Sequence, residues 1–180
     1  MRILIIGGTG LLGYHATREF LTHGDEVKIL ALPPAPAPGL FPDSVEICYK
    51  NLETLSDEEI SGVLQGVDAV VFAAGVDDRV TPKAPAYPFF HSHNVAPVAR
   101  LAKACADVGV RKLVSLGSYF AHFARQWPEL QLTKHHPYIH SRVEQTEAAV
   151  QSAGSQVAVI TLELPYIFGK MPGRMPLWKP

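Results

Sequence analysis

The apolar residues of this chain gather in short continuous runs that are separated by stretches with helical periodicity. The runs are β-branched or leucine-rich and do not alternate with polar residues, which is typical of strands buried on both faces of a parallel sheet. Six such runs predict strands over Arg2–Ile6, Glu26–Leu30, Val45–Tyr49, Val67–Ala73, Lys112–Leu116 and Val157–Leu162.

The intervening segments predict helices, because their apolar residues recur three or four positions apart. These helices cover Leu11–Leu21, a short stretch after Ser56, then Phe89–Val108 and Tyr138–Ala153. Ser56 and Glu59 have the spacing of a capping box. Strands that alternate with helices predict an α/β fold. We expect a doubly wound parallel sheet of the Rossmann type with strand order 3-2-1-4-5-6 and helices on both faces.

Three glycines at positions 7, 10 and 13 lie between the first predicted strand and the first predicted helix. A glycine turn at this place lets the backbone approach a pyrophosphate, whose charge is stabilised by the helix N-terminus. A tight turn without a ligand is the alternative, but the strand–turn–helix context favours binding. The turn therefore predicts a dinucleotide site, most naturally for a nicotinamide dinucleotide.

Composition narrows the class of protein. With 180 residues and 47% hydrophobic content, the chain is expected to form one domain over residues 1–180 with one core. The net charge of −1, with basic residues spread along the chain, gives no sign of nucleic-acid or membrane binding. Cys48 and Cys105 match no metal spacing and indicate a reducing compartment. With no apparent signal peptide or membrane span, we expect a cytoplasmic protein.

Residues 33–42 contain five prolines directly after the second predicted strand. Proline removes a backbone donor and stiffens the chain, so this segment cannot lie inside a sheet. A rigid surface loop is favoured over a polyproline ligand, because the segment lies within the domain.

Further small or polar residues occur at the ends of the predicted strands and on the later helices. In chain order these are Asn51-Leu52, Ala73-Ala74-Gly75, Asn94-Val95, Ser118, the segment 137–144 with Tyr138 and Arg142, and Leu164–Gly169. Together with the glycine turn they resemble the short-chain dehydrogenase/reductase superfamily, in its extended branch of sugar-nucleotide epimerases and dehydratases. The resemblance covers essentially all 180 residues.

The resemblance implies a set of residues that hold NAD or NADP. They are Gly7, Thr9, Gly10, Leu11, Leu12, Gly13, Asn51, Leu52, Ala73, Ala74, Gly75, Asn94, Pro165 and Ile167. It also implies a catalytic set of Ser118, Tyr138 and Arg142. Tyr138 would be the acid or base, Arg142 one helical turn later would favour its ionised form, and Ser118 would donate to the substrate oxygen. An ordinary tyrosine at a helix start is the alternative for Tyr138.

The chain departs from the family pattern at the catalytic cation and in the residues that select the cofactor. Arg142 stands where the family has lysine, and its planar guanidinium does not release a proton, so we expect weaker catalysis than a typical member shows. Residues 31–34 after the second strand offer neither the carboxylate typical of NAD binding nor the arginine typical of NADP binding. Asn51 carries an amide where the family has a carboxylate. The choice between NAD and NADP therefore stays open.

Length is the third departure, because family members continue well past the sixth strand. The sequence predicts either a fragment or a form without the substrate lid. The apolar run Met175-Pro176-Leu177-Trp178 favours the fragment, since such residues normally pack against further chain.

Histidines cluster around the predicted helices at positions 91, 93, 135, 136 and 140. No carboxylate or thiolate accompanies them at metal-ligand spacing, so no metal site is expected. His136 and His140 flank Tyr138 and are candidates for substrate contact. The roles of Tyr119 and His122 are left open.

These patterns favour an NAD(P)-dependent oxidoreductase or epimerase/dehydratase that acts on a small hydroxyl or carbonyl substrate such as a sugar nucleotide. A non-catalytic NAD(P)-binding sensor or interaction module of the same fold is the alternative, and a purely structural domain is disfavoured by the glycine turn. The resemblance also implies a homodimer formed through the helices Phe89–Val108 and Tyr138–Ala153.

Overall fold

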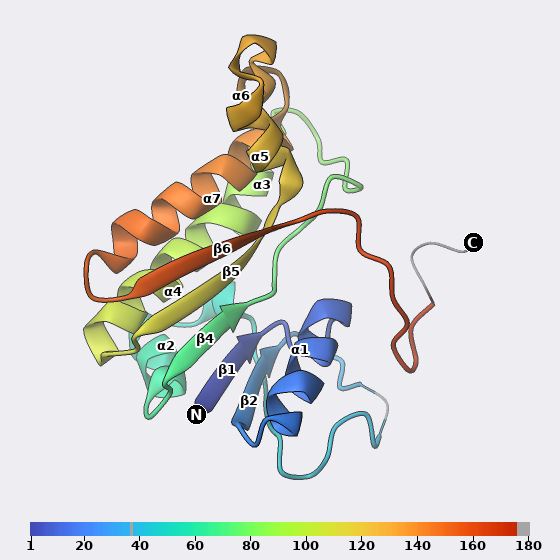
Figure 1. The fold of residues 1–180 in the computed structure, drawn as a ribbon, viewed down its shortest axis with the longest axis vertical. Coiled ribbons are helices and arrows are strands. Elements are labelled where there is room, and N and C mark those ends of the chain that lie inside the picture. The colour runs from blue at the N-terminus through green and yellow to red at the C-terminus, as the bar shows by residue number, and fades with distance from the viewer. Residues whose placement is uncertain (37, 176–180) are drawn as a thin grey trace.

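The computed structural model describes residues 1–36 and 38–175. It contains one sheet of six parallel strands in the order β3-β2-β1-β4-β5-β6, which confirms the predicted topology (Figure 1). The strands are β1 (Arg2–Ile6), β2 (Glu26–Ala31), β3 (Glu46–Tyr49), β4 (Ala69–Phe72), β5 (Lys112–Ser118) and β6 (Ala158–Leu164). The strand order reverses between β1 and β4, and in such sheets ligands bind beyond the carboxyl ends of the strands at that point.

Helices of eight residues or more alternate with shorter helical turns along the described chain. The longer ones are α1 (Leu11–Thr22), α2 (Asp57–Leu64), α4 (Ala96–Val108), α5 (Tyr119–Gln126) and α7 (Pro137–Ala153). The shorter ones are η1 (Leu52–Thr54), α3 (Tyr87–Phe90), η2 (His91–Val95), η3 (Pro128–Leu130) and α6 (Leu132–His135). The predicted capping box at α2 is confirmed: the Glu59 backbone N–H donates to Ser56 Oγ at 3.2 Å, and the Ser56 N–H donates to Glu59 Oε2 at 3.0 Å.

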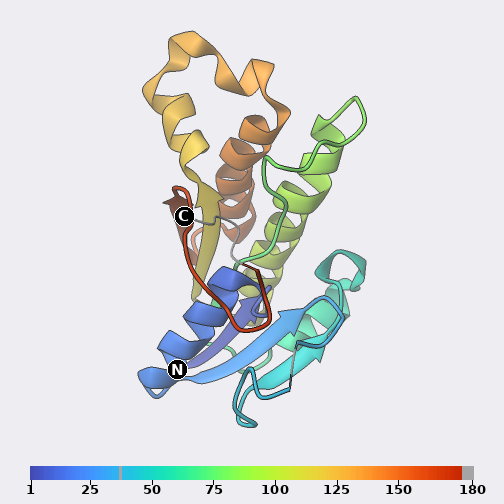
Figure 2. The ribbon, with the colours of Figure 1, turned by 90° about the vertical axis from the view of Figure 1, so that its right-hand side faces the viewer.

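The helices form two layers, one on each side of the sheet (Figures 1 and 2). On one face α2, α4 and α7 pack against alternate residues of the central strands, including Leu4, Val70 and Leu113, which are fully buried. On the other face α1 covers β1, β2 and β4 through residues such as Phe20, against Ile5. Burial of both faces explains why these strands read as continuous apolar runs.

The second face is covered less completely than the sequence predicts. Ile160 and Leu162 of β6 point away from α7 and are 48% and 45% exposed. In the described part of the chain α1 is the one long helix on this face, and it packs over β1, β2 and β4. The outer end of the sheet, at β5 and β6, therefore presents apolar side chains to solvent.

The long predicted helix is continuous but begins earlier and changes its winding. It starts at Tyr87 rather than Phe89, and His91–Val95 forms a π-helical segment before α4. Pro97 has no N–H to donate to the His93 carbonyl, so the regular α-helical bonding is interrupted at that point.

Between β5 and α7 lies a helical extension that the sequence analysis did not predict. It consists of α5, η3 and α6, and Figure 1 shows it projecting beyond the carboxyl ends of the strands. Ser118 is the N-cap of its first helix, α5, and its side chain accepts a hydrogen bond from the Phe120 N–H at 3.3 Å. Tyr119, Phe123 and Trp127 follow at helical spacing and contact one another ring to ring.

After β6 the chain turns back toward α1 (Figures 1 and 2). His15 Nε2 of α1 lies 2.9 Å from the Lys170 carbonyl oxygen, and Met171 is buried. Met175 is 74% exposed, whereas residues 176–178 of the apolar run lie outside the described residues. No helix in residues 1–36 and 38–175 is both long and apolar enough to span a membrane.

Candidate active site

The glycine turn between β1 and α1 is packed so closely that side chains are excluded from it. Gly7 has a φ of +80°, and a Cβ there would lie 2.8 Å from the carbonyl oxygen of Ala73. A Cβ on Gly13 would lie 2.4 Å from the carbonyl oxygen of Gly7. Gly10 precedes α1 and offers no side-chain cap, so the first N–H groups of the helix are left for another acceptor. Such a turn is suited to an anionic group.

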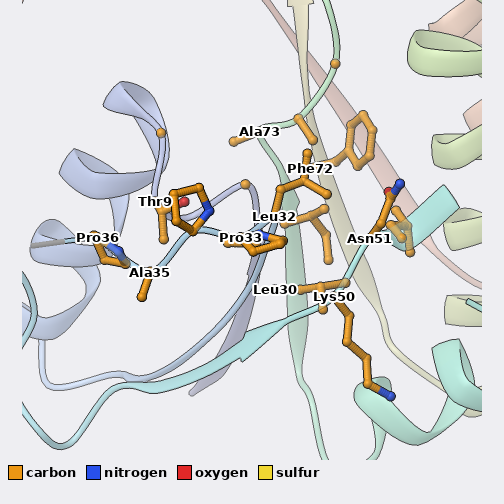
Figure 3. Close-up of a pocket in the computed structure, with 18 of the residues that line it drawn as sticks. Thr9, Leu30, Leu32, Pro33, Ala35, Pro36, Lys50, Asn51, Phe72 and Ala73 are labelled. Carbon is orange, nitrogen blue, oxygen red and sulfur yellow. The ribbon is translucent and has the colours of Figure 1, made fainter. Parts of the chain in front are cut away.

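A cavity of about 620 Å³ opens in front of this turn, and we call it cavity A (Figure 3). It lies beyond the carboxyl ends of β1, β2 and β4, at the reversal of the strand order. Eight of the residues expected to hold a dinucleotide line it: Gly7, Thr9, Gly10, Asn51, Leu52, Ala73, Ala74 and Gly75. Its volume is within the range of small-molecule and cofactor sites.

The proline-rich loop forms one wall of cavity A, with Leu32, Pro33 and Pro36 against it (Figure 3). It is therefore more than a surface linker. The side chain of Lys50 extends away from the cavity toward α2, where Nζ lies 2.9 Å from Glu59 Oε1. Met171 and Arg174 of the returning segment after β6 also line cavity A.

A second cavity of about 400 Å³, cavity B, lies on the β5 side of the glycine turn. Gly10, Ala73, Ala74 and Gly75 line both cavities, so the two share a wall. The remaining expected residues that line cavity B are Leu11, Leu12, Ser118, Tyr138, Arg142, Pro165 and Ile167. The structure thus brings the whole expected catalytic set to one cavity.

Tyr138 is held firmly at the N-terminal end of α7, with 4% of its surface exposed. Its ring packs edge to face against Phe90 and Phe120, at centroid distances of 5.6 and 6.3 Å. Arg142 lies one turn later, with its Cζ atom 5.2 Å from the ring centroid of Tyr138. This distance is within the range of a cation–π contact, so the positive charge lies beside the phenol ring.

Two expected cofactor residues, Gly13 and Asn94, line neither cavity among the described residues. Asn94 is fully buried, and its Oδ1 accepts a hydrogen bond from the Val76 N–H at 2.9 Å. Its Nδ2 donates to Ser141 Oγ at 3.2 Å, so it ties α7 to the loop after β4. A Cβ on Gly75 would lie 2.6 Å from Asn94 Oδ1, which explains why glycine is required beside it.

The sequence analysis missed a charged segment that faces Tyr138 across cavity B. Asp77, Asp78 and Arg79 line the cavity from the loop after β4. Arg79 Nε donates to Asp77 Oδ2 at 2.9 Å, and this bond lowers the pKa of the Asp77 carboxyl. The signal was a run of three charged residues two positions after Gly75.

Cavity B also contains a pair of phenols, one of which is Tyr119, whose role the sequence left open. Tyr119 and Tyr166 line the cavity, and their ring centroids are 5.5 Å apart. A hydrogen bond to Tyr166, followed by burial, raises the pKa of Tyr119 to about 12. Tyr119 therefore stays a neutral hydroxyl at physiological pH.

The histidines do not gather into one site. His93 lines cavity A, whereas His122 of α5 has its Nδ1 4.0 Å from Oε2 of Glu163 of β6, and His140 stacks on Tyr87. Within the described ranges, no group of three His, Cys, Asp or Glu side chains is arranged to hold a metal ion.

Comparison with known proteins decides the family. The model of the NAD dependent epimerase/dehydratase family matches residues 3–176, nearly the whole chain. The chain belongs to this family. A curated relative, the UDP-glucose 4-epimerase of Lactobacillus helveticus, is 30% identical over 122 residues, which are 63% of this chain and 34% of that protein.

Solved structures with this fold include two NAD complexes. The UDP-glucuronic acid 4-epimerase of Bacillus cereus matches with a TM-score of 0.72 and 15% identity, over 97% of this chain and 60% of that one. The enzyme WbmG of Bordetella bronchiseptica matches with a TM-score of 0.71 and 18% identity, over 94% and 54%. This chain thus spans about a third of the length of the curated relative and little more than half of the length of these two solved structures.

Proposed function

We propose that this chain binds NAD across cavities A and B and catalyses oxidation and reduction at a hydroxyl-bearing carbon of a sugar nucleotide. One observation carries the proposal: the wall formed by Gly10 and Ala73–Gly75 joins the cavity with the glycine turn to the cavity with Ser118 and Tyr138. A ligand lying along that wall would touch both.

The residues present fit a dinucleotide. Gly7 and Gly13 leave no room for side chains beside the turn, and the first turn of α1 has no side-chain cap. A pyrophosphate would accept hydrogen bonds from these backbone N–H groups. Asn51 and Leu52 would border the adenosine end, and Pro165 and Ile167 the nicotinamide end. When bound, NAD supplies hydride transfer.

The catalytic groups would then act on the substrate. Tyr138 would take the proton of the substrate hydroxyl during oxidation and return it during reduction. Arg142, 5.2 Å from its ring centroid, would stabilise the phenolate form. Ser118, which lines the same cavity, would donate a hydrogen bond to the substrate oxygen as charge develops there.

The substrate class is supported by the relatives and by the lining of cavity B. The curated relative is a UDP-glucose 4-epimerase, and the Bacillus cereus relative acts on UDP-glucuronic acid. Arg79, Tyr119 and Tyr166 add polar groups to the apolar wall of cavity B, as a hydroxylated sugar requires.

The test begins with calorimetric titration of the chain with NAD, NADH, NADP and NADPH. NAD binding at micromolar concentration is expected, followed by epimer or dehydration products when UDP-glucose, UDP-glucuronic acid or dTDP-glucose is added and products are separated by chromatography. Tyr138→Phe should lower turnover by about 100-fold or more without changing NAD affinity. Tyr49→Phe, at a partly exposed position on β3, is the matched control and should change neither.

Nucleotide binding without catalysis is the second candidate, and the setting of Arg142 favours it. The guanidinium donates to protein carbonyl groups, to Val76 O at 2.8 Å and to Gln145 Oε1 at 2.7 Å. A sensor would bind NAD with the same affinity in the unchanged protein and in Tyr138→Phe, and neither protein would convert a sugar nucleotide. Failure of all four nucleotides to bind would contradict both candidates.

A further inference from the structure

We infer that Gln145, a residue outside both cavities, is a positioning residue that fixes Arg142 beside Tyr138. The inference rests on the function proposed above, in which Tyr138 gives and takes a proton. Tyr138, Arg142 and Gln145 are spaced by four and three residues, so they share one face of α7.

Arg142 is a buried cation without a carboxylate partner. It is 7% exposed, and none of the ion pairs within 4.0 Å among the described residues includes it. Its Nη1 donates to Gln145 Oε1 at 2.7 Å, and its Nη2 donates to the Val76 carbonyl oxygen at 2.8 Å. The Nε atom of Arg142 is buried and has no hydrogen-bond partner among the described residues. Because a buried charge needs hydrogen bonds, the two carbonyl oxygens decide where the guanidinium lies.

Gln145 is itself fixed from the other side. It is fully buried, and its Nε2 lies 2.9 Å from Ser115 Oγ and 3.4 Å from the Leu116 carbonyl oxygen. The Leu116 carbonyl only accepts hydrogen bonds, and the guanidinium only donates them. The amide must therefore turn its NH2 group to β5 and its oxygen to Arg142. This orientation follows from hydrogen-bond chemistry alone.

The arrangement links β5 to the phenol ring through hydrogen bonds and a final cation–π contact. Ser115 and Leu116 orient Gln145, Gln145 and Val76 orient Arg142, and the guanidinium lies against the ring of Tyr138. Without the acceptor at 145, the guanidinium would keep one anchor and would move within the cavity. The charge beside Tyr138 would then weaken.

The test is a titration of Tyr138 by NMR, in protein labelled with ¹³C at tyrosine Cζ and measured without nucleotide or substrate. Tyr138→Phe assigns the signal among the six tyrosines. Besides Arg142, the groups that face Tyr138 are Arg79 from the loop after β4, Tyr119 from α5 and His136 at the start of α7. These stay unchanged in every variant below.

Gln145→Met keeps the size of the side chain and removes its hydrogen bonds. We expect it to raise the pH midpoint of Tyr138 ionisation, because a displaced guanidinium stabilises the phenolate less. In an Arg142→Met background the same substitution should cause no further change. An unchanged midpoint, or an equal change in both backgrounds, would overturn the inference.

Gln145→Asn serves if Gln145→Met does not fold, which a thermal melt reveals. The shorter amide stays polar but withdraws the acceptor from Arg142, so the midpoint should again rise. Gln151→Asn makes the same change at an exposed position on the same helix and should leave the midpoint unchanged. Equal shifts in the two asparagine variants, or no shift in either, would refute the inference.

The experiments distinguish failure of the positioning role from failure of the proposed function. If Tyr138→Phe retains full turnover, the catalytic role is wrong whatever Gln145 does. If turnover depends on Tyr138 while the titration ignores Gln145, only the positioning role is wrong.

Discussion

Gly13 and Gly7 lie so close together that a Cβ on Gly13 would be 2.4 Å from the carbonyl oxygen of Gly7. The contact joins the first turn of α1 to the end of β1, and it fixes the direction in which the uncapped N–H groups of that helix point. The same close packing therefore excludes side chains from the turn and leaves the helix N–H groups open to an anion.

Gly13→Ala should therefore destabilise the fold and weaken NAD binding together. The backbone carbonyl of Gly7 cannot move without displacing β1, so we expect a loss of about 1–3 kcal/mol in unfolding free energy, as overpacking typically causes. NAD affinity should fall by at least about tenfold, since one lost charge-assisted hydrogen bond suffices for that. Thermal melts and calorimetric titration measure the two effects.

Gly62→Ala is the matched control for that substitution. Gly62 lies within α2, and nothing lies within 4 Å of a Cβ placed there. Alanine should stabilise the helix by about 0.5–1 kcal/mol and leave NAD binding unchanged. Equal effects of the two alanines on NAD binding would contradict the role given to the turn.

Arg142→Lys tests how far the guanidinium limits catalysis. An ammonium is compact and exchanges its protons, so turnover on the substrate found by the screen should rise, by about tenfold if proton transfer limits the rate. Loss of one of the two hydrogen bonds to Val76 and Gln145 should lower the unfolding free energy by about 1 kcal/mol.

Arg100→Lys separates the two effects. Arg100 of α4 also bonds a backbone carbonyl, that of Leu55 at 2.8 Å, but lies outside both cavities. It should lose similar stability without any gain in turnover. No gain in turnover from Arg142→Lys would refute the prediction that arginine at this position weakens the proposed catalysis.

Asn94→Ala should disturb the site from outside it. The substitution leaves the part-buried N–H of Val76 without its acceptor, which costs about 1–3 kcal/mol. Because Val76 also anchors Arg142, both NAD affinity and turnover should fall. Ser92→Ala, an exposed position on the same helix whose hydroxyl bonds within that helix, should change neither. Unaltered NAD binding in Asn94→Ala would restrict Asn94 to a purely structural role.

The phenol pair of cavity B gives a prediction at alkaline pH. The pKa of Tyr119 is raised to about 12 mainly by its hydrogen bond to Tyr166. A raised pKa in the folded state means that the pair stabilises the fold below about pH 10, where an unfolded tyrosine is protonated. That contribution is lost as the pH rises from about 10 to 12. Tyr166→Phe should lower the pKa of Tyr119 in the ¹³C titration and remove this part of the alkaline destabilisation; an unchanged pKa would contradict the pairing.

Pairing of two copies through α4 and α7 stays a prediction. The two helices pack on each other along the same face of the sheet, and Val150 on α7 is 50% exposed. Light scattering at micromolar concentration should give twice the chain mass of 19.6 kDa, and Val150→Glu should shift the protein toward the monomer. A strict monomer in the unchanged protein would contradict the prediction.

Much of the fold could be predicted because its signals are local. Apolar runs mark the strands, helical spacing marks α1, α2 and α4, and the glycine turn places β1 at the centre of the sheet. The projecting α5 was missed although Tyr119, Phe123 and Trp127 have helical spacing. The π-helical segment was not predicted, although Pro97 signals an interruption of the helix. How the backbone of the preceding turn adapts to the missing N–H cannot be read from the sequence.

The site was predicted less completely because several of its parts depend on tertiary contacts. Ser118 and Tyr138 carry family signals, and they line one cavity as expected. Gln145 is an unremarkable polar residue in the sequence, and its partners Ser115 and Arg142 come together only when α7 packs on β5. Likewise the prolines after β2 gave no sign that they would border cavity A.

The wall shared by the two cavities has a thermodynamic consequence. Gly10 and Ala73–Gly75 line both cavities, so a ligand that touches them from one cavity would change the surface that a ligand in the other cavity meets. Such coupling is reciprocal: whatever factor one ligand applies to the affinity for the other, the second must apply to the affinity for the first. The order in which the two leave the protein is thus set by their separate dissociation rates, while the coupling free energy between them is a single quantity.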